Sequence, residues 1–321
     1  MTSKRFLRTK SVLAAAAGLL LLSACGESAS PTATEGGSDA GAGKDTIIFA
    51  AVPSEESTAL QAGYDTIIKL IEQDTGMTVE FQNATDYAAV IEGQRAGKID
   101  IAAYGPFSYK IAKDGGVPVE PLGSLVDAPD EEPGYLSLLW TKADNDEINE
   151  IGDVRDKRVC FVDKASTSGY LYPSAGLLAE DIDPESDVTP VMAGGHDASL
   201  LGVKNDQCDA GFAYDTMIDT MTNSGQITDG ELKQVWESET IMGSPIAMNT
   251  ETLSAETQQQ LRDLVPKANK PAMVEAGICT DEASCHLAEE SGWGMVKVED
   301  SQYDGIRRVC ELTNAEACNA A

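Results

Sequence analysis

Three consecutive hydroxyl residues stand where a predicted strand meets a predicted helix: Ser166, Thr167 and Ser168. One hydroxyl is enough to cap a helix, because a single side-chain oxygen can accept from the free amides of the first turn. The same amides and the helix dipole favour an anion at this position. Three hydroxyls together with several amides therefore suit a tetrahedral oxyanion. A polar loop with one helix cap is the alternative interpretation.

Three further polar side chains follow predicted strands or open a predicted helix. Tyr104 ends a strand before Gly105, and it could hold a ligand oxygen, stack on an apolar ligand group or belong to the core. His196 follows two glycines and opens a helix, where the dipole disfavours its cation but a ring nitrogen can still donate; a surface cap is the alternative. Asp215 follows a strand, and a carboxylate suits an anion site only if the anion keeps a proton.

Serine, histidine and aspartate are all present, so an exported hydrolase is an alternative function. However, no serine lies in a G-x-S-x-G sequence, His196 and His286 are the only histidines, and no cluster has the spacing of metal ligands. The chain also lacks a G-x-G-x-x-G sequence and a P-loop, which argues against a nucleotide site. We therefore predict no catalytic residue, no cofactor and no metal.

The elements that must position these residues alternate along the chain from residue 45. Short apolar runs predict strands, and apolar residues at helical spacing predict the helices between them. The predicted strands are 46–52, 77–81, 99–105, 134–140, 157–163, 187–192, 208–214 and 244–249, and the predicted helices include 57–76, 85–98, 196–206 and 254–268. This alternation predicts an α/β fold built of open, mostly parallel sheets with helices on both faces.

The order of these elements predicts two lobes. Residues 45–125 with 245–321 would form the first lobe and residues 126–244 the second. Two crossovers would then connect them, near 126–135 and 238–246, and act as hinges. Ligands bind beyond the carboxyl ends of strands in open α/β sheets, so two facing edges would form a cleft that can close.

The N-terminus has the pattern of an export signal. A basic start, a short apolar run and small residues precede Cys25, so we expect 1–24 to be a signal peptide. Its ending resembles a bacterial lipoprotein box, which implies that Cys25 is lipidated; an ordinary signal peptide is the alternative. Residues 25–44 are small and polar, typical of a flexible tether. No later segment is apolar enough to span a membrane.

The composition and the net charge limit the kinds of molecule that the chain could recognise by charge. The chain has 321 residues, 42% of them hydrophobic, and a formal net charge of −30, which argues against nucleic acid or an anionic membrane as a partner recognised by charge. An even set of six cysteines in an exported chain predicts disulfides, with 15 possible pairings. Two pairs would close short loops, and the third would join two strands of one sheet. These pairs are Cys279 with Cys285, Cys310 with Cys318, and Cys160 with Cys208.

Four stretches, in this order, carry a family resemblance: "TDYAAVIEGQRAGKIDIAAYGPFSY", "STSGYLYPSAGLL", "GGHDASLLGVKNDQCDAG" and "SPIAM". Over roughly 45–270 the chain is similar to the PhnD-like substrate-binding proteins of bacterial ABC importers for phosphonate, phosphite or phosphate. The resemblance implies a type II periplasmic binding protein fold with two hinged lobes and no catalysis.

The resemblance also implies a set of ligand-binding residues. The Ser166–Ser168 run would hold the phosphorus oxyanion, and Tyr104 and His196 match the tyrosine and histidine of the family site. An acidic position maps to Asp215 or its neighbour Thr216. The remaining candidates are Ser54 and Glu55 in the first loop, and Ser244. Members that bind an aminoalkyl phosphonate carry an acid where this chain has Ser244, which argues against a ligand with an ammonium group.

Together these observations predict a lipid-anchored, extracytoplasmic, monomeric binding protein. It would close around a small phosphorus oxyanion and deliver it to the transmembrane subunits of an ABC permease. A ligand sensor for a membrane signalling partner, or an exported hydrolase, is the alternative. The sequence leaves open which phosphorus oxyanion is preferred.

Overall fold

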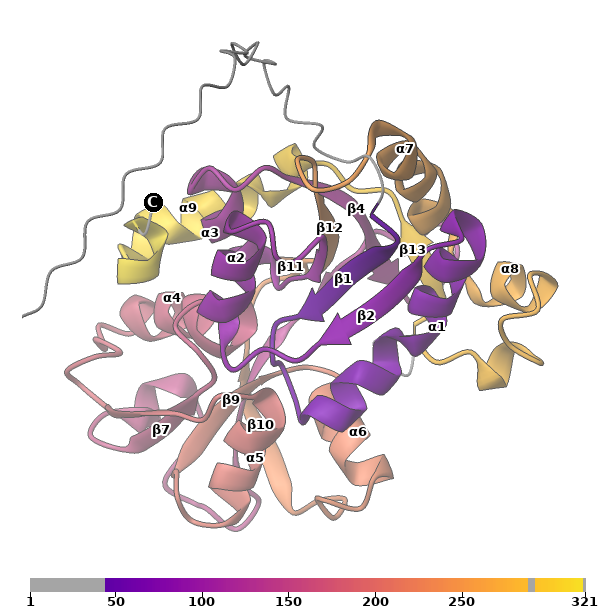
Figure 1. Cartoon of the computed structure of the whole chain (residues 1–321). Coiled ribbons are helices and arrows are strands. Elements are labelled where there is room, and N and C mark those ends of the chain that lie inside the picture. The colour runs from indigo at the N-terminus through magenta and orange to yellow at the C-terminus, as the bar shows by residue number, and fades with distance from the viewer. Residues whose placement is uncertain (1–43, 288–291, 320–321) are drawn as a thin grey trace, which may run out of the picture. The chain divides into compact units, whose positions relative to one another are not determined.

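A computed structural model describes residues 44–287 and 292–319 of the protein. The predicted signal peptide, Cys25 and nearly all of the predicted tether lie outside the described residues. Within the described ranges, no helix has both the length and the apolar character needed to cross a membrane. Two larger sheets and their flanking helices form this part of the chain (Figure 1). The predicted α/β class is confirmed.

The first sheet has the strand order β13-β4-β12-β3-β1-β2. Its strands are β1 (Thr46–Ala51), β2 (Thr78–Gln82), β3 (Ile101–Ala103), β4 (Val119–Val126), β12 (Pro245–Asn249) and β13 (Gly294–Val296). The helices that pack on it are α1 (Ser57–Thr75), α2 (Tyr87–Arg95), α3 (Pro106–Asp114), α7 (Ala255–Leu264) and α9 (Asp304–Thr313). We call this sheet with its helices the first lobe.

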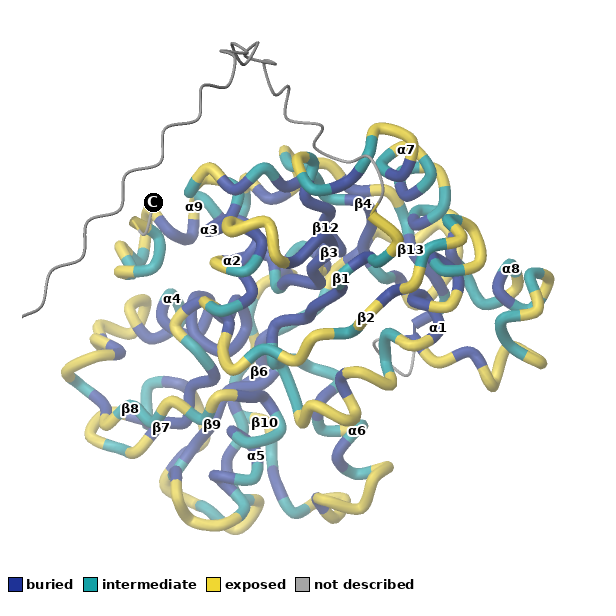
Figure 2. Tube along the Cα trace, viewed as in Figure 1, coloured by how far each residue is buried: buried dark blue, intermediate teal, exposed yellow. Residues whose placement is uncertain are grey.

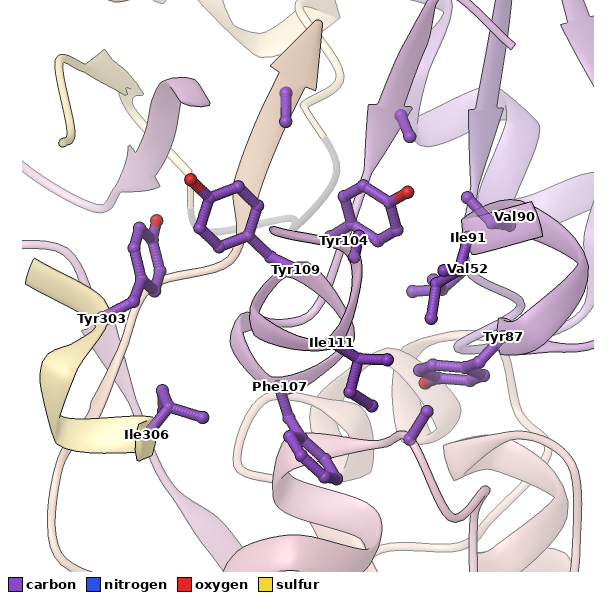
Figure 3. Packing of buried hydrophobic residues seen from close by; sticks show 14 of the residues in the cluster. Val52, Tyr87, Val90, Ile91, Tyr104, Phe107, Tyr109, Ile111, Tyr303 and Ile306 are labelled. Carbon is purple, nitrogen blue, oxygen red and sulfur yellow. The ribbon is translucent and has the colours of Figure 1, made fainter. Parts of the chain in front are cut away.

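Alternation along β1 explains why helices cover both faces of this sheet. Phe49 and Ala51 belong to the core under α1 and α7, whereas Ala50 and Val52 belong to the core under α2 and α3. Successive side chains of a strand point to opposite faces, so a wholly apolar strand needs cover on both. Figure 2 shows central strands such as β3 and β12 buried and much of the helix surface exposed, and Figure 3 shows the core around α2 and α3.

The second sheet has the strand order β10-β6-β9-β7-β8. Its strands are β6 (Ser137–Lys142), β7 (Arg158–Phe161), β8 (Thr189–Met192), β9 (Ala210–Tyr214) and β10 (Leu232–Glu237). It packs against α4 (Tyr172–Ala179) on one face and α5 (His196–Lys204) and α6 (Met217–Asn223) on the other. We call this sheet with its helices the second lobe.

The expectation of mostly parallel sheets is wrong, because both sheets are mixed. β1 pairs in parallel with β2 and β3, but β12 runs antiparallel to β3 and β4. Ile246 near the start of β12 pairs with Ala103 at the end of β3, so β12 enters from the carboxyl edge of the sheet. A strand that enters from this edge must run against the parallel strands. β6 enters the second sheet in the same way, with Ser137 opposite Tyr214.

The two crossings between the lobes form a short antiparallel ladder. It consists of β5 (Gly134–Tyr135) and β11 (Ile241–Met242), with Ile241 opposite Tyr135. Beside it, the hydroxyl of Tyr303 donates to the carbonyl of Gly243 at 3.1 Å. Helix α9 follows Tyr303 and contacts α3 of the first lobe and α4 of the second. The C-terminal segment therefore lies against both lobes next to the crossings.

Three disulfides are formed by the six cysteines beyond Cys25. Cys279–Cys285 closes a loop after α8 (Lys270–Glu275), and Cys310–Cys318 ties the end of α9 to the chain that follows. Cys160 of β7 pairs with Cys208, which lies in the turn before β9 and not in a strand. The expected link between two strands is therefore a link between β7 and the turn that joins α5 to β9.

Candidate functional site

A cavity of about 100 Å³ lies between the carboxyl edges of the two sheets. The first lobe contributes the loop after β1, one side of α1, the start of α2 and the end of β3. The second lobe contributes the turn after β7, the start of α5 and the end of β9. Of the residues predicted from the sequence, those that line the cavity are Ser54, Glu55, Tyr104, Ser166, Thr167, Ser168, His196 and Ser244.

The hydroxyl run opens a wide helical turn that leads into α4. Residues Thr167–Leu171 form one turn of π-helix, in which the amide of Leu171 bonds the carbonyl of Ser166 at 3.1 Å. Such a turn leaves the amides of Thr167 and Ser168 outside its own hydrogen-bond ladder. Glycine is needed at 169, because a Cβ there would lie 2.4 Å from the Cβ of Val162. The close packing of this turn on the end of β7 presents amides and hydroxyls together at the cavity.

Two hydroxyls of the run, those of Ser166 and Thr167, accept hydrogen bonds from different backbone amides. Ser166 accepts from the amide of Gly169 at 3.1 Å and so acts as the cap that the sequence predicts, and it faces the hydroxyl of Tyr87. Thr167 accepts from the amide of Phe107 in the first lobe at 2.8 Å. A hydroxyl has one donor and two acceptor positions, so these contacts leave room for a ligand.

Tyr135 joins several of the hydroxyls into one cluster. It lies in the crossing strand β5, and its phenol faces the side chains of Thr167, Ser168 and Ser244, which favour its charged form. Burial raises the pKa values of both Tyr135 and Tyr87 well above the ordinary tyrosine value. Both phenols therefore stay protonated at neutral pH and can donate.

His196 is a neutral donor in this site. Its side chain is 3% exposed, and burial lowers its pKa to about 3. Nδ1 accepts from the amide of Tyr214 at 3.3 Å, which assigns the ring proton to Nε2. The ring of Tyr214 packs edge-on against the imidazole at 4.7 Å between centroids and fixes its orientation.

A contact between the Tyr104 hydroxyl and a ligand stays a prediction. Tyr104 lines the cavity and is 2% exposed, but its hydroxyl donates to Oε1 of Gln94 at 2.9 Å. Gln94 is itself buried in α2 and donates to the carbonyl of Ala247 at 3.2 Å. The phenol thus bonds within the core. In Figure 3 the hydroxyls of Tyr104 and Tyr109 diverge from each other.

The assignment of Asp215 to the ligand stays a prediction, although neither Asp215 nor its neighbour Thr216 lines the cavity. The carboxylate of Asp215 accepts from the amide of Leu136 at 3.0 Å and from the amide of Thr216 at 3.2 Å. In this structure the carboxylate therefore stabilises the backbone at the start of β6.

Sequence reasoning missed the aromatic residues of the site. Tyr87, Tyr135 and Tyr214 line the cavity together with apolar residues of α1 such as Leu60. Tyr87 directly follows the predicted start of a helix, so its position was detectable. Tyr135 and Tyr214 reach the cavity only because the crossing strand and β9 end there.

Among the described residues, the lining of the cavity contains no lysine or arginine, and Glu55 is the one charged residue in it. The polar donors are hydroxyls, a neutral imidazole and backbone amides. Within the described residues, no cluster of His, Cys, Asp or Glu could hold a metal ion. An anion in this cavity would therefore be held by oriented dipoles, which need no charge of their own.

Two α/β lobes that enclose such a cavity define a type II periplasmic binding protein. The chain belongs to the family described as the periplasmic substrate-binding protein of phosphonate ABC transporters, whose model matches residues 49–284.

Two curated relatives support this assignment. The chain is 43% identical over 318 residues to the phosphate-import protein PhnD of Mycolicibacterium smegmatis, covering 96% of this chain and 97% of the relative. It is 31% identical over 269 residues to the phosphonates-binding periplasmic protein of Escherichia coli, covering 81% and 75%.

Solved structures share the fold. A binding protein of an ABC phosphonate transporter from Pseudomonas aeruginosa has a TM-score of 0.73 at 26% identity, over 84% of this chain and 87% of that one. PhnD1 of Prochlorococcus marinus in complex with methylphosphonate has a TM-score of 0.72 at 16% identity, over 85% and 99%. The second likeness shows the fold alone.

Proposed function

We propose that this protein captures a small phosphorus oxyanion, such as phosphate, phosphite or a short phosphonate, by closing its two lobes. The observation that carries the proposal is the hydroxyl turn Ser166–Ser168, which presents amides and side-chain oxygens to a small cavity shared by both lobes. The names of the two curated relatives support phosphorus as the central atom.

Neutral donors are sufficient for this task. A hydrogen bond to a charged group contributes about 1.5–3 kcal/mol, and several can converge on one tetrahedral anion. Exclusion of water on closure strengthens each of them. The net charge of −30 slows the approach of an anion somewhat, but physiological salt screens it beyond about 8 Å.

The cavity also suggests where a protonated oxyanion would place its hydroxyl. Asp215 is turned to the crossing strand, so we do not propose it as the acceptor. Among the described residues, the carboxylate that lines the cavity is that of Glu55. We propose that it accepts a hydrogen bond from the hydroxyl of a monoprotonated ligand. The neutral Ser244, which faces Tyr135, supports a ligand without an ammonium group at that position.

The division into lobes is part of the proposal. Residues 45–125 with 245–321 would move against 126–244, with the β5–β11 ladder as the hinge. A ladder of two short strands can twist with little loss of packing. Three of the four apolar cores lie within one lobe, whereas the core around α2 and α3 also includes Val162, Ala165, Leu171 and Tyr172 of the second lobe.

The N-terminus and the family of the protein support a proposal for its location and its partners. We propose that residues 1–24 are removed, that a lipid on Cys25 anchors a monomer outside the cytoplasm, and that the permease subunits of an ABC importer receive the ligand. We also propose that the protein is not an enzyme, since Nδ1 of His196 is occupied by the amide of Tyr214. Replacement of Cys25 by serine should release the protein from the membrane fraction.

Calorimetry with a panel of anions tests the proposed ligand class. The panel contains phosphate, phosphite, methylphosphonate and 2-aminoethylphosphonate, with sulfate as the control. We expect tight binding of at least one of the first three and weak binding of sulfate. If none of the phosphorus anions binds, the proposed ligand class is wrong. If the amino compound binds best, the interpretation of Ser244 is wrong.

A further inference from the structure

Three helices that begin at the cleft have incomplete N-terminal caps. Glu56 caps α1 with its carboxylate, which accepts from the amides of Thr58 and Ala59, but no residue of α1 bonds the amide of Glu56 itself. Helices α3 and α5 begin after Gly105 and Gly195, which have no side chain to accept from the first turn. Free amides at a helix start need an acceptor, either from the protein or from water.

The opposite lobe completes two of these caps with one pair of contacts. Oδ2 of Asp197, in the first turn of α5, accepts from the amide of Glu56 at 3.2 Å. The carbonyl of Ser54, in the loop before α1, accepts from the amide of His196 at 2.7 Å. Each helix start thus receives its acceptor from the other lobe, and we call these four residues the interlobe clasp.

The same pattern recurs along the cleft. The hydroxyl of Thr167 accepts from the amide of Phe107 in the first turn of α3 at 2.8 Å. Here the second lobe supplies the acceptor and the first lobe supplies the helix.

Asp197 is the informative member of the clasp, because its side chain spans the lobes without lining the cavity. The reach of a side chain back to the amide of a cap residue is the second half of a capping box, which here comes from a different lobe. Gly195 permits the close approach, since a Cβ there would lie 2.6 Å from Oδ1 of Asp197 and 3.4 Å from the carbonyl of Ser54.

We propose that reciprocal helix capping between the lobes holds the closed form, and that Asp197 is a positioning residue which sets ligand affinity without touching the ligand. A ligand that binds the closed form has an apparent affinity proportional to the population of that form. Loss of an acceptor that exists only in the closed form lowers this population and leaves the open form unchanged. The inference rests on the proposed function in one respect only, which is that the binding of phosphate is used to report closure.

The test compares the variants Asp197→Ala and Asp197→Asn with the wild type. Alanine leaves the Glu56 amide without its acceptor on closure, and we expect phosphate to bind three- to tenfold more weakly. Asparagine keeps an acceptor oxygen, and we expect it to restore affinity to within twofold. The melting temperature of the ligand-free protein should change little in either variant.

The matched control is a helix cap that lies within one lobe. Ser254 accepts from the amide of Thr257 at the start of α7 and does not line the cavity. We expect Ser254→Ala to lower the melting temperature and leave phosphate affinity unchanged. If Asp197→Ala behaves in the same way as Ser254→Ala, Asp197 is only a structural residue and the proposal is overturned.

Amide exchange measured residue by residue supplies a readout that does not depend on affinity. With and without phosphate, we expect Asp197→Ala to accelerate exchange at Glu56 while exchange in β1 and β7 stays as in the wild type. Failure of phosphate to bind would contradict its choice as ligand, whereas an unprotected Glu56 amide in both wild-type samples would contradict the clasp. Gly195→Ala is the second variant, because alanine fits the extended backbone there (φ −150°) but its Cβ intrudes on the clasp. It should also weaken binding and accelerate exchange at Glu56, and unchanged values would count against the proposal.

Discussion

The hydroxyl oxygen of Thr167 lies 2.8 Å from the backbone nitrogen of Phe107, although 60 positions separate the two residues in the chain. Thr167 belongs to the turn after β7 in the second lobe, and Phe107 to the first turn of α3 in the first lobe. A single side chain therefore lines the cavity and connects the lobes. We therefore predict that binding and closure are coupled at this residue, because an acceptor position of its hydroxyl already holds the start of α3.

The variant Thr167→Val tests this coupling. Valine has nearly the same shape but removes both the acceptor for Phe107 and a donor for the ligand. We expect anion affinity to fall at least tenfold, since an unmet hydrogen bond to a buried or charged group costs about 1–3 kcal/mol. The control is Thr141→Val, where the hydroxyl donates to the carbonyl of Asp209 within the second lobe at 2.7 Å. It should lower the melting temperature without changing affinity in calorimetry.

A second prediction concerns the protonation of His196. Its pKa is lowered to about 3 in the folded protein by burial, whereas an unfolded histidine titrates near 6.5. Between these values the unfolded chain binds a proton that the folded chain does not, so stability is full above about pH 6.5 and decreases as the pH falls toward 3. Unfolding by urea at several pH values should show this slope, and His196→Gln should flatten it. An unchanged slope in the variant would show that other groups cause it.

Tyr135 should matter for binding through its hydroxyl alone. The variant Tyr135→Phe removes the hydroxyl that faces Thr167, Ser168 and Ser244 but keeps the ring. We expect a three- to thirtyfold loss of affinity, because the site loses a polar group beside the serine and threonine hydroxyls. Tyr109→Phe is the control, since that hydroxyl donates to Asp300 within the first lobe at 3.0 Å. Equal losses in both variants would argue against a specific role for Tyr135.

The variant Asp215→Asn tests whether Asp215 binds the ligand, as the sequence predicts, or only holds the backbone, as its contacts in the structure indicate. The carboxylate bonds the amides of Leu136 and Thr216, which an asparagine oxygen can also accept. Affinity should therefore stay within about threefold of the wild type at neutral pH, by the small cost of a weaker acceptor. A loss of a hundredfold or more in calorimetry would return Asp215 to the binding site.

The disulfide Cys160–Cys208 should contribute more stability than the other two. It closes a separation of 48 residues, against 6 for Cys279–Cys285 and 8 for Cys310–Cys318. Chain entropy alone predicts about 4 kcal/mol for the long loop and about 2 kcal/mol for each short one. Paired Cys→Ser variants compared by urea unfolding test this order. A larger loss for either short loop would show that local packing outweighs loop entropy.

Local patterns in the sequence were sufficient for part of the site. Residues 166–168 lie between a buried strand and a helix, and this order alone predicts amides and hydroxyls at one point. His196 after Gly194 and Gly195 is a second local pattern, and its place at the start of α5 is confirmed. Such predictions hold because the strand, the turn and the helix start are determined by residues within a few positions of each other.

Tertiary structure alone decided which polar groups face the cavity. Tyr104 and Asp215 both lie at the ends of strands, as expected. However, the hydroxyl of Tyr104 bonds Gln94, and the carboxylate of Asp215 bonds the amide of Leu136, which lies 79 positions away. Tyr135 enters the site because two distant crossings pair beside it. A polar side chain bonds the nearest satisfiable partner in space, and spatial neighbours across a sheet or a cleft leave no periodic signal in the sequence. The sequence therefore determined the alternating elements and the hydroxyl turn, and the packing of the two lobes determined how the site is completed.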